Sequence, residues 1–212
     1  RVSTVEFVCH HVTPEINVKS ILNEFRNGQT PIKTGVGYLN NQIYLAQLSK
    51  TKAKRPGSLG YGIYTFVDGI LDPTELCKSF SNRLMKHIRV KEVFFYIEIE
   101  QENLIDLTNS QSEQYQLFVN FCRAINKKIT QTNHTFDKSG ENQFVWEGIA
   151  MELFIQYMEK HHSVVTYGVL RDTFTPCDVD DVPASERITS NGNEFLIRNW
   201  KIVRDIKHNV LK

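Results

Sequence analysis

The sequence predicts an α+β fold in which strands near both ends of the chain flank a central helical block. Strand-like runs of alternating, β-branched and aromatic residues occur before residue 110 and again after residue 162. Between them, residues 112–129 and 144–161 have the apolar spacing of two long helices. Separate blocks of strands and helices are typical of α+β domains rather than of alternating βαβ units.

Length and composition favour one domain over residues 1–212, with a helical insertion at about 110–162. A chain of 212 residues that is 41% hydrophobic can form a substantial core. The net charge of +1 gives no overall signal for nucleic acid or membrane binding. The four cysteines form no CxxC pair, and the sequence shows no signal peptide and no membrane-length apolar run. These features predict a cytoplasmic protein without membrane contact.

Each strand and helix has a local signal. Pro14 is tolerated in the first turn of its helix, and the Asp72-Pro73 pair is a typical helix start. The predicted elements are, in order, a strand over 5–11, a helix over 14–25, a short strand or helix start over 42–48, a strand over 63–67, a helix from 72, strands over 93–99 and 104–107, the two long helices, and strands over 164–170, 194–197 and 200–203.

Three segments contain candidate functional residues. Three glycines at 57, 60 and 62 leave the backbone without Cβ atoms, so a ligand can approach it closely, and Tyr64 follows with a ring that can stack on a planar heterocycle. His11, at a strand end, can bind a sugar hydroxyl, and Glu194 opens an apolar strand. Taken singly, each has a simpler interpretation as a core side chain or a solvated strand end.

In their order along the chain, these segments resemble the ADP-ribosyltransferase superfamily, in the diphtheria-toxin and poly(ADP-ribose) polymerase branch with its His-Tyr-Glu triad. His11-Val12-Thr13, with Asn17 and Ile21-Leu22, resembles the HGS/T…N…IL segment of that branch at the same spacing. Leu59 to Tyr64 resembles its GxGIY segment, and Asn193-Glu194-Phe195 resembles its NEY strand. The resemblance covers roughly two thirds of the chain and leaves residues 110–162 unmatched.

The resemblance implies a split two-sheet β core with flanking helices, whose cleft binds NAD as a substrate without a metal. It implies that His11 binds a ribose 2′-hydroxyl with support from Thr13, and that Tyr64 stacks on the nicotinamide. Glu194 would hold the nicotinamide-ribose 2′-hydroxyl and stabilise the positive charge that develops as the glycosidic bond breaks. The remaining residues of the implied cofactor site are Val12, Gly60, Gly62 and Phe80.

The sequence departs from the family pattern at two places. Val12 stands where the family has glycine, and its side chain narrows the expected site. A second stacking tyrosine is missing, because Glu75 occupies its position and Phe80 is the nearest ring. The His-x-Thr form is similar to that of a related group of nucleic-acid-modifying toxins. His10 is a rival to His11, although the spacing to Ile21 favours His11.

Other chemistries receive less support from the residues. Glu147 is a rival catalytic acid, for which capping of an apolar helix is the preferred interpretation, and Glu141, Glu152 and Glu159 are predicted on a solvated helix face. The sequence lacks HExxH and GxxxxGK[ST] motifs, and Cys9 and His10 should point to opposite faces of their strand. The basic run at 50–55 is a solvated loop or a contact for phosphates.

The resemblance implies an NAD-dependent ADP-ribosyltransferase that modifies a macromolecule and releases nicotinamide, and the His-x-Thr form with the nearby basic run gives a slight preference for nucleic acid over protein. Family analogy adds a toxin or antiphage-type defence effector, with an antitoxin or inhibitor protein as a partner. Two alternatives stay open: a catalytically degenerate module that binds ADP-ribose, nucleic acid or protein, and an NAD glycohydrolase.

Overall fold

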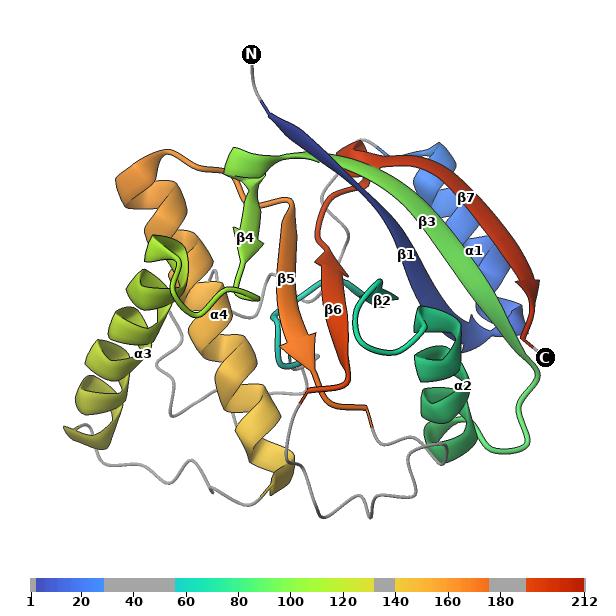
Figure 1. The fold of residues 1–212 in the computed structure, drawn as a ribbon, viewed down its shortest axis with the longest axis horizontal. Coiled ribbons are helices and arrows are strands. Elements are labelled where there is room, and N and C mark those ends of the chain that lie inside the picture. Colours follow the sequence, from blue (N-terminus) through green and yellow to red (C-terminus); the bar gives the residue numbers. More distant parts are fainter. Residues whose placement is uncertain (1–2, 29–55, 132–139, 176–189, 212) are drawn as a thin grey trace.

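The computed structural model describes residues 3–28, 56–131, 140–175 and 190–211. These residues form the predicted α+β fold, with seven strands in one mixed sheet and four α-helices (Figure 1). The strands are β1 (Thr4–Pro14), β2 (Ile63–Val67), β3 (Val90–Glu100), β4 (Leu104–Asp106), β5 (Gly168–Thr173), β6 (Gly192–Ile197) and β7 (Val203–Val210). The helices are α1 (Glu15–Arg26), α2 (Pro73–Leu84), α3 (Glu113–Gln131) and α4 (Gly140–His162).

The sheet has the strand order β4-β5-β6-β2-β1-β3-β7. The β4–β5 pair is parallel and all the other pairs are antiparallel. β1 and β3 pair along their whole length, whereas β1 and β2 share the single register pair His10↔Phe66. The expectation of two separate sheets is therefore wrong, because this pair joins the strands into one sheet. The two halves of the sheet meet with few backbone hydrogen bonds at the β1–β2 boundary.

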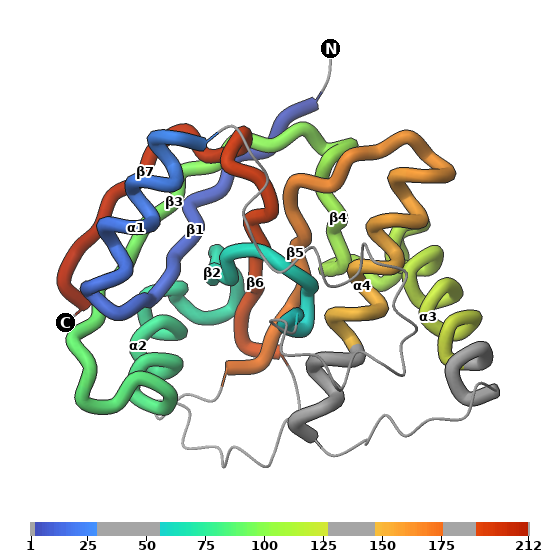
Figure 2. Tube along the Cα trace, turned by 180° about the vertical axis from the view of Figure 1, so that it is seen from behind, coloured from blue at the N-terminus to red at the C-terminus, as the bar shows by residue number. Residues whose placement is uncertain are grey.

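Helices cover both faces of the sheet. α1 packs Val18, with the half-buried Ile21 and Phe25, onto a core cluster that includes Phe95 and Phe195. α2 covers the opposite face, where its apolar side chains meet β1 and β2, and α1 and α2 accordingly lie on opposite sides of β1 in Figure 1 and in the reversed view of Figure 2. α3 and α4 lie side by side at the β4 end of the sheet.

The helices follow the sequence signals closely. The Asp72 side chain accepts a 2.7 Å hydrogen bond from the Thr74 N–H, and Pro73 occupies the first turn of α2, as predicted. The two helices predicted over 112–129 and 144–161 are present as α3 and α4. Their apolar faces form a cluster with the sheet that includes Met151, Phe154 and Leu196.

The C-terminal elements differ from the prediction. The strand predicted from 164 begins at Gly168, and Trp200–Ile202 is a 3₁₀ turn because the Asn199 side chain accepts the Lys201 N–H. The strand follows instead as β7, which the sequence pattern missed because it is a mostly exposed edge strand rich in charge. The predicted element at 42–48 and the basic run at 50–55 lie outside the described residues.

Candidate functional site

Tyr64 and Glu194 lie on neighbouring antiparallel strands and on the same face of the sheet. Tyr64 is opposite Leu196 and Phe66 is opposite Glu194 in the β2–β6 register. Directly opposed residues in antiparallel strands share a face, as do residues two apart on one strand. Leu196 and Tyr64 belong to the apolar cluster under α4, whereas Phe66 belongs to the cluster under α2. Glu194 therefore lies at the boundary between the two clusters.

The Glu194 carboxyl group is half-buried and lies beside the Arg171 side chain. Burial raises the pKa of Glu194, while the Arg171 guanidinium and a hydrogen bond with the Thr173 side chain act in the opposite direction. Arg171 is directly opposite Glu194 in the β5–β6 register. It also contacts Glu147 of α4, at 3.2 Å from Nη1 to Oε2. The carboxyl groups of Glu194 on β6 and Glu147 on α4 thus both lie near the Arg171 guanidinium.

The phenol of Tyr64 is held by residues 57–62, the glycine-rich segment that precedes it. Its hydroxyl accepts a hydrogen bond from the Leu59 N–H and donates one to the Gly60 carbonyl, each at 2.9 Å. Burial raises the pKa of this hydroxyl well above its ordinary value, with the Leu59 hydrogen bond opposing the shift. A Cβ at Gly57 would collide with the Tyr64 ring. The segment thus wraps around the phenol.

The glycines at 60 and 62 also make room for the protein's own atoms. Gly60 has φ +97°, a left-handed conformation that favours glycine, and a Cβ there would meet the Glu152 carboxylate. A Cβ at Gly62 would meet Leu196 and the Ile197 carbonyl. The close approach predicted at these glycines is therefore made by side chains and backbone of the same chain.

Glu152 is buried, which contradicts the prediction that it lies on a solvated helix face. Its carboxylate accepts the Tyr61 N–H at 2.6 Å and forms a two-point ion pair with Arg198, in which Nη2 lies 3.0 Å from Oε2. Arg198 also donates to the Tyr61 carbonyl at 2.9 Å. One ion pair thus holds both backbone groups of Tyr61 and ties the glycine-rich segment to α4. Glu159 is exposed, as predicted.

His11 lies at the gap between β1 and β2. Its Nδ1 is 2.7 Å from the Tyr64 carbonyl oxygen. A carbonyl only accepts, so Nδ1 carries the proton and Nε2 of the neutral ring is left as an acceptor. Burial lowers the pKa of His11 and favours the neutral ring, while the hydrogen bond to the Tyr64 carbonyl opposes this shift.

The predicted triad is only partly gathered on one face. His11 alternates with His10 along β1, so its ring lies on the face of Cys9 and stands edge-on to Phe95, at 6.3 Å between ring centroids. Tyr64 and Glu194 point to the other face. His11 is connected to them through the Tyr64 backbone, at the boundary where the β1–β2 ladder stops after one pair.

The remaining predicted binding residues are packed against helices. The Val12 side chain is buried with Phe66 under α2, and Phe80 stands edge-on to Phe66 at 6.3 Å between ring centroids. Thr13 is buried, and its hydroxyl accepts a 3.4 Å hydrogen bond from Asn17 of α1. Val12 thus fills space between β1 and α2.

The structure changes the interpretation of Glu147. Glu147 is seven residues inside α4, which begins at Gly140, so its predicted role as an N-terminal cap is wrong. It lies beside Arg171 instead. Sequence reasoning missed Arg171 and the Glu152–Arg198 pair, because the partners are 24 and 46 residues apart along the chain and meet only where α4 packs on the sheet.

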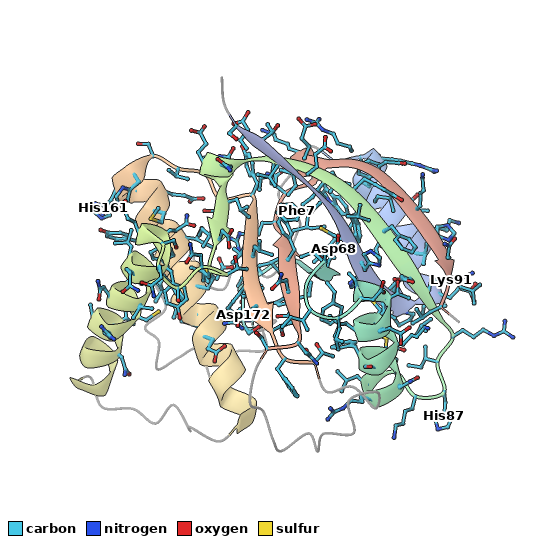
Figure 3. All side chains as sticks on the ribbon, in the orientation of Figure 1. Phe7, Asp68, His87, Lys91, His161 and Asp172 are labelled. Carbon is cyan, nitrogen blue, oxygen red and sulfur yellow. The ribbon has the colours of Figure 1, made fainter. Side chains whose placement is uncertain are left out.

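Two cavities on the described part of the chain lie away from this site. One cavity, of about 600 Å³, is lined by residues that include Phe7 of β1 and Asp68, the residue after β2 (Figure 3). The other, of about 550 Å³, is lined by residues that include Glu102 and Lys201. Neither is lined by Tyr64 or Glu194. Within the described ranges, no group of three or more metal-binding side chains occurs, and no helix is long and apolar enough to cross a membrane.

Comparison with known proteins gives no family assignment. No model of a known protein family matches the chain, and no curated protein matches it.

Replacing Tyr64 with Phe should destabilise the fold by about 1–3 kcal/mol, because the Leu59 N–H and the Gly60 carbonyl lose their partner in a buried setting. The free energy of unfolding, measured by urea denaturation, checks this. Tyr167→Phe is the matched control, since the half-buried Tyr167 has no hydroxyl partner among the described residues. Equal stability of the two variants would contradict the assigned role of the phenol.

Proposed function

We propose that this protein is an NAD-dependent ADP-ribosyltransferase that modifies a macromolecule and releases nicotinamide. The observation that carries the proposal is the position of Glu194, a half-buried carboxyl group on the same face as the Tyr64 ring and opposite Arg171. The motif order of His11, Tyr64 and Glu194 along the chain supports the same function.

The chemistry requires one bond to break and one to form at the ribose C1′. The bond to the nicotinamide nitrogen breaks and its electron pair leaves with the ring, while a lone pair of the acceptor forms the new bond and the acceptor loses a proton. Glu194, when ionised, stabilises the positive charge that develops on the ribose between these events. Arg171 favours the ionised form that this role requires.

His11 and Tyr64 supply orientation in this proposal. The fixed tautomer of His11 leaves Nε2 to accept a hydrogen bond from a ribose hydroxyl. The phenol of Tyr64 is already held by the backbone of the glycine-rich segment, so its ring is presented in one orientation without further loss of side-chain entropy.

A second function, a non-catalytic binding module, is favoured by the packing around the site. Val12 is buried where the family has glycine, and the glycines at 60 and 62 are already in contact with the protein's own atoms. Such packing leaves less room for a nicotinamide than the family pattern implies.

Incubation with NAD labelled in the adenosine part, followed by separation of RNA, DNA and protein, distinguishes these functions. Transfer predicts label in one pool together with free nicotinamide, and the sequence gives a slight preference for nucleic acid. Free ADP-ribose as the sole product would indicate NAD hydrolysis. Binding of NAD without release of nicotinamide in the presence of all three pools would refute the transferase and support the binding module.

A further inference from the structure

A row of side chains crosses the sheet on the face that carries Glu194. Arg171 on β5 is opposite Glu194 on β6, which is opposite Phe66 on β2, which is opposite His10 on β1. All four share one face, because directly opposed residues of antiparallel strands do. Strands are about 4.8 Å apart, so the backbones at His10 and Glu194 are roughly 10 Å apart with Phe66 between them. His10, unlike His11, therefore shares the face of Glu194.

His10 is held by a buried carboxylate. Its Nδ1 lies 2.8 Å from Oε1 of Glu92, a residue on β3 that is 4% exposed. The Thr74 hydroxyl of α2 donates to the same oxygen at 2.8 Å. A carboxylate accepts, so the imidazole donates through Nδ1 and its Nε2 lone pair is left to take a proton. Phe94 stands edge-on to the ring at 4.9 Å between centroids and limits its rotation.

A histidine whose Nδ1 donates to a buried carboxylate is oriented so that its Nε2 can act as a general base. A base needs a fixed tautomer, an orienting group behind it and a path to the reacting atom. The His10 side chain is 14% exposed, and the next residue on the same strand face, Val8, is 41% exposed. Thr74 lies in the first turn of α2, so the start of this helix lies beside Glu92 and His10.

We infer that His10 takes the proton from the acceptor nucleophile in ADP-ribose transfer, with Glu92 as the residue that positions it. This role rests on the proposed function. Glu194 stabilises the ribose cation, and His10 removes the acceptor's proton as its lone pair forms the bond to C1′. The backbones of the two residues are roughly 10 Å apart on one face of the sheet, on either side of Phe66.

The alternative is that His10, Glu92 and Thr74 form only a structural connection between α2, β1 and β3. A Thr74→Val variant tests that connection while keeping the imidazole and its bond to Glu92, because it removes one of the two hydrogen bonds to Oε1 of Glu92 and a longer 3.4 Å contact with Nδ1 of His10. We expect it to lower the thermal unfolding midpoint while leaving unchanged the ratio of transferred ADP-ribose to released nicotinamide.

The decisive variant is His10→Asn, whose side-chain amide can still donate to Glu92 but has no basic nitrogen at the outer position. With NAD and a mixture of total RNA, single-stranded DNA and total protein as the acceptor probe, transfer should fall about 10²–10⁴-fold, the usual contribution of a general base. Nicotinamide release with water as acceptor should fall much less. Imidazole added to a His10→Gly variant should restore transfer, and His208→Asn, at an exposed position on β7, should change neither rate.

The outcomes separate this inference from the proposed function. Equal loss of transfer and nicotinamide release in His10→Asn, or full transfer by that variant, would overturn the role of His10 while the transferase proposal stands. Failure of imidazole to rescue His10→Gly, when that variant is folded, would also overturn it. Absence of NAD cleavage by the wild-type protein, or cleavage without label in any pool, would overturn both.

Discussion

Glu194→Gln should lower nicotinamide release by about 10²–10³-fold, the usual effect of removing one preorganised group that stabilises transition-state charge. The amide keeps the shape of the side chain and its contact with Thr173, but it brings no negative charge to the face shared with Tyr64. Nicotinamide release under saturating NAD measures the effect. The affinity for NAD should change little, because the lost interaction develops only as the bond breaks.

Asp172→Asn is the matched control for this variant. Asp172 is an exposed carboxylate on β5, next to Arg171 in the chain, and alternation along the strand places its side chain on the face opposite to that of Glu194. It should retain wild-type nicotinamide release. A similar loss in both variants would show that general charge, and not the position of Glu194, controls the reaction.

The same substitution should stabilise the protein at neutral pH. Burial raises the pKa of Glu194 above its ordinary value of 4.5, so the folded chain binds this proton more tightly than the unfolded chain. The free energy of unfolding then falls as pH rises from 4.5 through the folded-state pKa. Glu194→Gln removes this decline, and unfolding curves of both proteins across that range test it. A steeper decline in the variant would contradict the assigned burial.

Activity of the wild-type protein should follow the opposite trend. The ionised carboxylate is the form that stabilises a ribose cation, so nicotinamide release should rise as the pH passes through the raised pKa of Glu194. The ionised Glu194 carboxylate therefore lowers the stability of the fold at neutral pH and is also the form that the proposed reaction requires.

Glu152→Ala should lower the free energy of unfolding by about 3–5 kcal/mol, because it leaves the Arg198 guanidinium without its buried partner. The Tyr61 N–H also loses its acceptor. Chemical denaturation checks the loss, and Glu159→Ala, at an exposed position on the same helix, should cost far less. A double replacement of Glu152 and Arg198 by Met should recover much of the stability, since it removes both charges.

The same variant should also affect the site. The Glu152–Arg198 pair holds Tyr61, and the backbone of residues 59 and 60 holds the Tyr64 phenol. Loss of the pair therefore loosens the segment that fixes the ring. A Glu152→Ala protein that keeps wild-type stability would show that the ion pair does not anchor the glycine-rich segment.

The sequence predicted the strands that form the middle of the sheet and missed features that depend on long-range pairing. The alternation of residues 5–11 and 93–99 is strong because β1 and β3 are buried on one face and pair along their length. β7 escaped prediction because an exposed edge strand needs few apolar residues. The single β1–β2 pair was also unpredictable, since no local pattern encodes how far two strands stay together.

The candidate site shows the same limit. The spacing of motifs singled out Tyr64 and Glu194, and strand register places both on one face. The sequence motif did not show that the Tyr64 phenol and the Glu152 carboxylate pack against the glycine-rich backbone. Glu152 is 91 residues away from Tyr61, whose N–H it accepts, and no local pattern encodes such a contact. Period-two alternation did predict opposite directions for neighbouring strand residues, and it is this rule that separates His10 from His11.

A crystal structure of the Glu194→Gln variant with NAD tests the central claim most directly. The proposed function predicts the nicotinamide ribose beside residue 194 and the Tyr64 ring. NAD bound in one of the cavities lined by Asp68 or by Lys201, with Tyr64 and residue 194 untouched, would contradict the account.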